Sequence, residues 1–115
     1  MHREGSIVLF SFPETGGAPG KVRPALLLRK LPNSSDDWLI CLISSQLRHR
    51  VLDLNEVIYS TDKDFPQSGL KVPSLFRASR LNVSSQVLFR GIIGKISDDR
   101  LKKLRANLAN WLLFD

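Results

Sequence analysis

The sequence contains 115 residues, enough for one modest hydrophobic core, and we expect a single domain over residues 1–115. Hydrophobic residues make up 43% of the chain, a fraction that excludes a generally disordered protein. The 17 lysines and arginines outnumber the 11 aspartates and glutamates, so the net charge is +6. Such an excess on a small domain favours polyanionic partners, above all nucleic acid, although a basic surface can also take no part in binding.

The sequence also argues against a membrane or secreted protein. Its apolar runs are shorter than the roughly 18 residues that a membrane helix needs. Its first residues, MHREGSIVLFSF, contain an acidic residue and no small-residue cleavage site, unlike a signal peptide. The single cysteine, Cys41, cannot close an intramolecular disulfide and is expected in the core. We therefore expect a cytoplasmic protein with no membrane partner.

Three strands are expected in the first part of the chain. They cover residues 5–12, 23–30 and 38–44, which are rich in branched and aromatic side chains. A loop rich in glycine and proline, residues 13–22, separates the first two strands, and a turn at 31–37 separates the next two.

Weaker strand patterns follow before the C-terminal segment. Residues 50–54 alternate between apolar and polar side chains, as a half-buried strand does. Residues 60–69 form a second polar loop, and residues 70–81 are expected to be extended. Residues 86–94 are expected to form a last short strand.

The C-terminal segment has the periodicity of an α-helix. Ser97 is the expected N-cap, and Asp98 and Asp99 follow in the first turn, where the helix dipole favours negative charge. One apolar face is formed by Leu101, Leu104, Leu108, Trp111 and Leu112. The other face is expected to be solvated and carries Arg100, Lys102, Lys103 and Arg105. These patterns predict a mainly β fold with a C-terminal helix packed on a small sheet or barrel.

The sequence lacks motifs for a metal or a cofactor, and we expect neither. His2, His49 and Cys41 do not have the spacing of zinc ligands. The segment GGAPGK lacks the spacing of a Walker loop, and there is no G-x-S-x-G nucleophile elbow.

An arginine stands at the start of the second expected strand. Arg23 follows the glycine-rich loop and is joined to Pro24 in GKVRPALLLRK. Its five N–H donors suit phosphate oxygens, and the strand behind it would hold it in place. The alternative is an arginine that caps the strand or pairs with a carboxylate. The sequence around Arg23 leaves both readings open.

A second polar group follows the third expected strand. In CLISSQLRHR, an apolar run ends at Ser44, Ser45 and Gln46 and continues into a basic cluster. Hydroxyls at a strand end are often turn caps, but beside basic residues they can also hold a phosphate. His49 in this cluster can be a surface histidine or, less often, a general base.

These segments carry a resemblance to a known family. GSIVLFSFP resembles the opening G-D-I-V strand of the MazF/PemK family, the toxins of bacterial toxin–antitoxin pairs. GKVRPALLL is similar to its G-x-RP-A-x-V-L motif, and CLISSQ to its strand ending in I-T-x-Q. GLKVPSLFRASRL and IIGKISDDRLKKLRANLANWL resemble its later segment and its closing turn and helix. The five segments occur in the family's order over nearly the whole chain.

The resemblance implies a fold, an activity and partners. It implies an SH3-like barrel of the MazF/PemK/CcdB-like type, usually a homodimer. It implies a metal-independent, sequence-specific endoribonuclease that cleaves single-stranded RNA, inhibited by an acidic antitoxin. The family's catalytic arginine falls on Arg23 and its catalytic threonine on Ser44. RNA is expected between residues 13–22 and 44–50, in contact with Lys21, Ser45, Gln46, Arg48, His49 and Arg50.

The chemistry of RNA cleavage suits these residue types. Without a metal, the RNA's own 2′-hydroxyl can attack the adjacent phosphate, if charge on the phosphorane is stabilised and protons are transferred. Arg23 is suited to stabilise the phosphorane, and Ser44 can bind a phosphate oxygen or relay a proton. DNA lacks the 2′-hydroxyl and would not be cut in this way.

Two alternatives remain open at this point. Acidic or amide residues common in the family are absent at Ser6, Ala18 and Ser79–Arg80, which keeps a non-catalytic RNA-binding barrel in consideration. The other alternative is a gyrase-poisoning toxin of the same fold, which would bind protein through the surface near the C-terminal helix. Trp111 could belong to that surface, although its position on the apolar face favours core packing.

Overall fold

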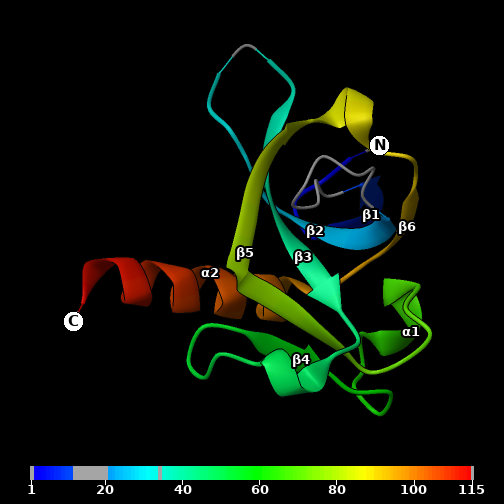
Figure 1. Ribbon diagram of the computed structural model, residues 1–115, viewed down its shortest axis with the longest axis vertical. Helices are drawn as coiled ribbons and strands as arrows, with labels where there is room; N and C mark the ends of the chain where they lie inside the picture. Colours follow the sequence, from blue (N-terminus) through cyan, green and yellow to red (C-terminus); the bar gives the residue numbers. More distant parts are fainter. Residues whose placement is uncertain (1, 12–20, 34, 115) are drawn as a thin grey trace.

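The computed structural model describes residues 2–11, 21–33 and 35–114 and shows one strongly curled antiparallel sheet (Figure 1). The six strands lie in the order β4-β5-β3-β2-β1-β6. They are β1 (Ser6–Ser11), β2 (Val22–Lys30), β3 (Asp37–Ser44), β4 (Glu56–Ile58), β5 (Ser74–Ser85) and β6 (Ile92–Lys95). The helical segments are η1 (Leu47–His49), α1 (Phe65–Ser68), η2 (Gln86–Leu88) and α2 (Asp98–Leu113). The predicted mainly β fold with a C-terminal helix is confirmed.

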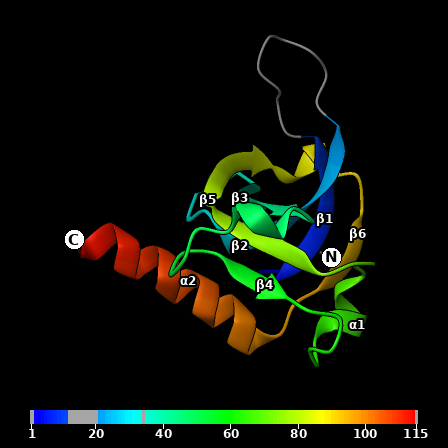
Figure 2. The same ribbon diagram turned by 60° about the horizontal axis from the view of Figure 1, so that its bottom comes forward.

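The sheet curls because its longest strand is bent in the middle. In the pairing of β3 with β5, the partner of Cys41 is Leu81, but the partner of the next residue, Leu42, is Arg77. The intervening residues of β5 are therefore in excess and form a bulge, which bends a strand and increases its twist. Figure 1 shows β5 running in two directions on either side of this point. The resulting half-barrel has α2 along one side (Figure 2).

Apolar side chains fill both faces of the curled sheet, because successive strand residues point to opposite sides. The larger core contacts α2 and includes Ile7, Leu26, Cys41, Ile43 and Phe76. The smaller core includes Val8, Phe10, Ala25, Leu27, Trp38 and Ile40 and is completed by Phe89. The expectation that Cys41 is a core residue is confirmed, since its exposed fraction is 0%.

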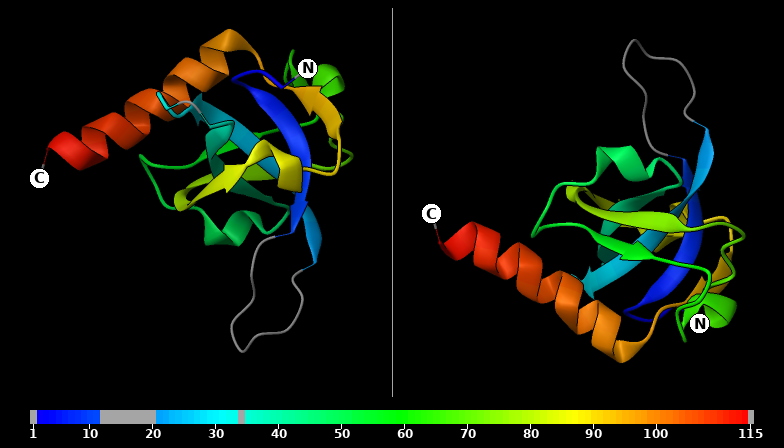
Figure 3. Two further views of the ribbon diagram at one scale, coloured as in Figure 1. Left: turned by 90° about the horizontal axis from the view of Figure 1, so that it is seen from above. Right: turned by 90° about the horizontal axis from the view of Figure 1, so that it is seen from below.

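The prediction for α2 is right at its N-terminus and wrong at its C-terminus. Ser97 is the N-cap, and its Oγ accepts a hydrogen bond of 3.2 Å from the Arg100 backbone N–H. The first part of the apolar face is buried through Leu101, Leu104 and Leu108. Trp111 and Leu112, expected on the same buried face, are 62% and 67% exposed. Figure 3 shows the reason: the last turns of α2 extend beyond the sheet, so no strand lies beneath them.

Arg100 is also not the solvated residue that its helical position suggested. Only 13% of its side chain is exposed. Its Nε donates to Asp64 at 2.9 Å, and its terminal nitrogens donate to Asp62 at 3.0 Å and to the Val57 carbonyl at 3.0 Å. Arg100 therefore ties the start of α2 to β4 and to the segment between β4 and α1.

Several predicted boundaries are wrong in the second half of the chain. Residues 50–54 form a turn, because the Asn55 side chain accepts from the Val51 backbone N–H and so satisfies it locally. The strand of this region is β4, and the polar loop at 60–69 contains α1. Within 86–94 a short helical turn precedes β6, and β5 starts at Ser74 rather than at residue 70. Most of the loop predicted at 13–22 lies outside the described residues.

Two glycines allow α1 to approach β6 at backbone distance. Gly69 ends α1 with a φ of +73°, and a Cβ there would lie 2.1 Å from the carbonyl oxygen of Ile93. A Cβ on Gly94 would lie 2.3 Å from the backbone of Ser68. This close approach positions the segment between α1 and β5, which forms one wall of the cavity described below.

Replacing Gly69 with alanine should destabilise the fold. The left-handed φ alone costs about 1–3 kcal/mol for a residue with a side chain, and the contact with Ile93 adds to this. Urea denaturation should show a lower free energy of unfolding for Gly69→Ala than for the control Gly91→Ala. Gly91 also has a positive φ, of +138°, but an added Cβ meets nothing within 4 Å. Equal stability of the two variants would contradict the close approach.

No helix in the described part of the chain is long and apolar enough to cross a membrane.

Candidate functional site

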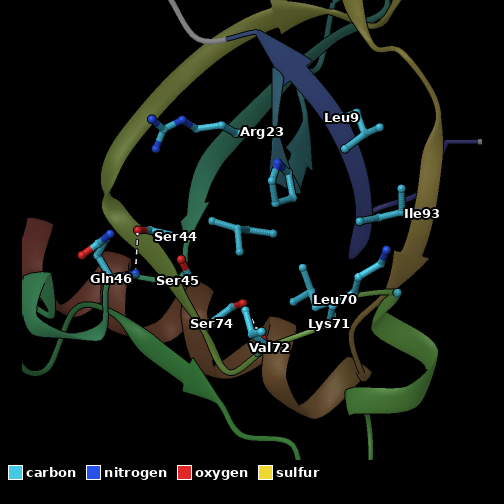
Figure 4. Close-up of a pocket in the computed structure, with 13 residues that line it drawn as sticks. Leu9, Arg23, Ser44, Ser45, Gln46, Leu70, Lys71, Val72, Ser74 and Ile93 are labelled. Carbon is cyan, nitrogen blue, oxygen red and sulfur yellow. Dashed lines mark hydrogen bonds between the residues drawn. The ribbon is translucent and has the colours of Figure 1, made fainter. Parts of the chain in front are cut away.

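A cavity of about 570 Å³ opens at one end of the half-barrel (Figure 4). Its apolar floor is formed by Leu9, Pro24, Ile43, Leu70 and Ile93. Its polar wall is formed by Arg23, Ser44, Ser45, Gln46, Lys71 and Ser74. The cavity therefore brings together the start of β2, the end of β3 and the segment that precedes β5, which are far apart in the sequence.

The register of the sheet places Arg23 beside Ser44. β2 and β3 pair Ala25 with Leu42, and continuing this antiparallel register by two residues sets Arg23 opposite Ser44. Paired residues point to the same face of a sheet. Figure 4 shows the Arg23 guanidinium and the Ser44 hydroxyl on the same side of the cavity. The two residues that the sequence singled out separately therefore line the same cavity.

The backbone orients the Ser44 hydroxyl. Ser44 is the last residue of β3 and is only 7% exposed. Its Oγ accepts a hydrogen bond of 3.0 Å from the Gln46 backbone N–H, drawn as a dashed line in Figure 4. Within the described residues nothing accepts from this hydroxyl, so its hydrogen is available to a ligand. Ser44 therefore acts as a turn cap and still retains a free donor.

Arg23 carries an exposed charge without a partner in the described part of the chain. By contrast, Arg105 is paired with Glu4 and Arg100 with Asp64. The reading in which Arg23 pairs with a carboxylate thus finds no support among the described residues. Its donors are free to meet an anion at the mouth of the cavity.

Lys71 is a cationic residue of the wall that the sequence reasoning missed. It lies two residues after Gly69 and lines the cavity on the side away from Arg23 in Figure 4. The sequence reasoning treated residues 70–81 as one extended segment and gave this lysine no role. The signal that could have found it is its position between Gly69 and Pro73, since both residues favour a loop.

The remaining predicted contact residues lie outside the cavity wall. Ser45 and Gln46 line it, but Lys21, Arg48, His49 and Arg50 do not. Residues 48–50 belong to η1 and its C-cap, directly after Gln46, and all three side chains are exposed. Lys21 is exposed just before β2. These four residues are therefore placed around the cavity and not within it.

Comparison with solved structures defines the class of fold. An endoribonuclease in complex with its cognate antitoxin, from a mycobacterial species, superimposes with a TM-score of 0.65 over 100% of this chain and 98% of that one. The two sequences are 12% identical, so the likeness shows a shared fold. The predicted MazF/PemK-like barrel is thereby confirmed.

The sequence then identifies the family. Residues 3–112 match the family of PemK-like, MazF-like toxins of type II toxin–antitoxin systems, and the chain belongs to it. A search of curated proteins gave no match.

Proposed function

We propose that the protein is the toxin of a type II toxin–antitoxin pair and cleaves single-stranded RNA at specific sequences without a metal ion. The observation that carries the proposal is that Arg23, which has no partner among the described residues, lines the same cavity as the oriented Ser44 hydroxyl. Family membership and the endoribonuclease fold of the structural neighbour support it.

The two residues have complementary roles in the proposed reaction. The 2′-hydroxyl of the RNA attacks the adjacent phosphate, the bond to the 5′-oxygen of the next nucleotide breaks, and a 2′,3′-cyclic phosphate is left. Arg23 stabilises the charge that develops on the phosphorane, and donors aimed at developing charge supply much of the rate enhancement in such sites. The 2′-hydroxyl gives its proton to water or to the Ser44 oxygen, and the leaving 5′-oxygen takes a proton from the same source. Ser44 either relays this proton or donates its hydroxyl hydrogen to a phosphate oxygen.

The proposed path of the RNA follows the cations around the cavity. Lys71 faces the cavity from the side away from Arg23, while Arg48 and Arg50 follow the strand end that holds Ser44. Lys21, Ser45, Gln46 and His49 complete the proposed contact surface. Cations that neutralise phosphates release bound counterions, so binding should weaken steeply as salt is added.

The proposal also includes two binding partners: an antitoxin and a second copy of the chain. The antitoxin is expected to be acidic, because the toxin is basic, and to cover the cavity. The C-terminal end of α2 and its C-cap support contact with another chain, since they expose Trp111, Leu112, Leu113 and Phe114. We propose that the toxin is a homodimer located in the cytoplasm.

A gel assay in EDTA tests the proposed activity. Purified protein is incubated with a mixed-sequence RNA and with the DNA of the same sequence. Cuts in the RNA alone, with 2′,3′-cyclic phosphate ends, are the expected result because DNA has no 2′-hydroxyl. Cleavage that requires added divalent metal, or cleavage of both nucleic acids, would contradict the mechanism.

Replacing Ser44 with alanine should slow cleavage by about 10²–10³, the typical effect of removing one preorganised donor. Ser44→Thr keeps the hydroxyl and should retain most of the activity. The measurement is the single-turnover cleavage rate of each variant. The melting temperature checks that each variant is folded. If both variants cleave at the wild-type rate, Ser44 has no part in the chemistry.

A second candidate function is a toxin that binds a protein target through the end of α2. The exposure of Trp111 favours it, because the sequence periodicity had placed this residue in the core. RNA left intact by the wild-type protein would favour this candidate.

A further inference from the structure

Arg77 on β5 carries a guanidinium group that nothing in the described structure pairs with. Its Nε is buried and has no hydrogen-bond partner, the one such side-chain atom among the described residues. It forms neither an ion pair nor a hydrogen bond with the described part of the chain. Leaving a buried donor unpaired destabilises the folded state, and more so when the group is charged. Such a group calls for an explanation outside the free protein.

The sheet register places Arg77 on the same face as Arg23. Arg77 pairs with Leu42 on β3, and Leu42 pairs with Ala25 on β2. Side chains in one cross-strand row share a face, and residues two apart on one strand also share it. Arg23 and Ser44 therefore occupy the next row of that face. At ordinary strand spacings the Cα atoms of Arg23 and Arg77 are about 12 Å apart.

A second arginine lies beside Arg77 at the bulge of β5. Arg80 follows three residues later and is exposed. Burial, and then the positive charge of Arg80, lower the pKa of the Arg77 guanidinium. Two cations close together disfavour each other unless an anion lies between them.

The bulge that presents these arginines is fixed in place. Asn55 is 1% exposed, and its Nδ2 donates to Ser79 Oγ at 3.3 Å. Its Oδ1 accepts from the Val51 backbone N–H at 2.8 Å. These hydrogen bonds hold Ser79 against the turn that follows η1. The part of β5 that carries Arg77 and Arg80 is therefore fixed in position.

We propose that Arg77, assisted by Arg80, binds a second phosphate of the RNA strand whose scissile phosphate meets Arg23 and Ser44. The inference rests on the proposed function and deepens it by assigning a positioning residue. RNA is favoured over an acidic peptide because Arg77 shares a sheet face with the Arg23–Ser44 pair, one row away. An extended polyanion lying across that face meets both sites.

Binding of a non-cleavable RNA over a range of salt concentrations tests the proposal. The probe is an oligonucleotide in which every 2′-hydroxyl is methylated, so that affinity is measured apart from cleavage. Loss of one phosphate contact should reduce the slope of log K against log salt by about 0.7, equivalent to about fivefold in affinity at 0.1 M salt. Arg77→Gln should show this change, and Arg77→Lys should retain most of the slope. The melting temperature of Arg77→Gln should be unchanged or raised, because an unpaired buried group is removed.

Lys102→Gln is the matched control. It removes the same charge from the exposed face of α2, and its salt slope should equal that of the wild type. An unchanged slope in Arg77→Gln overturns the inference, and so does an equal fall in Lys102→Gln, which would reflect net charge alone. A lower melting temperature of Arg77→Gln would assign a structural role instead. Weakened binding of an acidic partner protein with RNA binding intact would assign Arg77 to that partner.

The test separates the inference from the function on which it rests. Wild-type protein that binds the methylated RNA but fails to cleave ordinary RNA contradicts the proposed catalysis and leaves the Arg77 result valid. Wild-type protein that cleaves RNA, with an unchanged slope for Arg77→Gln, contradicts the inference alone. Wild-type protein that neither binds nor cleaves RNA contradicts both.

Discussion

Replacing Arg23 with alanine is expected to abolish RNA cleavage, with a loss of at least about 10²–10³ in the single-turnover rate. The reason is that Arg23 is the cation placed opposite the Ser44 hydroxyl at the cavity mouth. The folded state should be unaffected, since the side chain is exposed and has no partner among the described residues. Cleavage of a mixed-sequence RNA in EDTA and the melting temperature are measured on the same preparation.

Two further variants make this result specific. Arg23→Lys keeps the charge but loses the planar set of donors, so partial activity is expected. Arg3→Ala removes another exposed arginine, one that does not line the cavity, and should cleave like the wild type. Undiminished cleavage by Arg23→Ala would refute the site assignment. An equal loss in Arg3→Ala would show that overall charge matters and the position does not.

Replacing Arg100 with methionine is expected to lower the free energy of unfolding by about 3–5 kcal/mol, as when one partner of a buried ion pair is removed. Methionine preserves much of the apolar stem but leaves the Asp64 carboxylate, whose side chain is 7% exposed, without its cation. Asp62 and the Val57 carbonyl lose a donor at the same time. Urea denaturation measures the change.

Arg105→Met is the control for this loss. Arg105 also pairs with a carboxylate, that of Glu4, but both side chains are about one-third exposed, at 34% and 32%. Solvent screens such a pair, so the loss of stability should be clearly smaller. Equal losses in the two variants would contradict the view that burial makes the Arg100 cluster important.

The pH dependence of stability gives an independent signature of the same cluster. Burial alone would raise the pKa of Asp64, but hydrogen bonds from Arg100 and from the Ser97 backbone N–H outweigh it, so the pKa lies below its usual value. A lowered pKa in the folded state stabilises the protein fully above the unfolded value of about 3.9. That contribution is lost as the pH falls through the folded value. The acid-induced loss of stability should therefore be weaker in Arg100→Met than in the wild type.

The features that the sequence predicted correctly depend on neighbouring residues. The spacing of Leu101, Leu104 and Leu108 defines a helix face, and the Ser97 cap is formed within one turn. The first three strands were found in the same way, because alternation and β-branched residues act over a few positions. Arg23 and Ser44 were singled out on the same local ground, because Arg23 precedes an apolar run and Ser44 ends one, and their roles stay predictions.

The tertiary structure decided what depends on segments far apart in the chain. Arg100 is largely buried because β4 and the acidic segment after it pack against the start of α2, and Trp111 is exposed because the sheet ends partway along the helix. Helical periodicity reveals neither. Lys71 reaches the cavity because Gly69 lets α1 approach β6, and Arg77 shares a face with Arg23 because a bulge in β5 sets the register. Local propensities act within a few residues, whereas strand register, backbone approach and the length of sheet under a helix arise from the packing of distant segments.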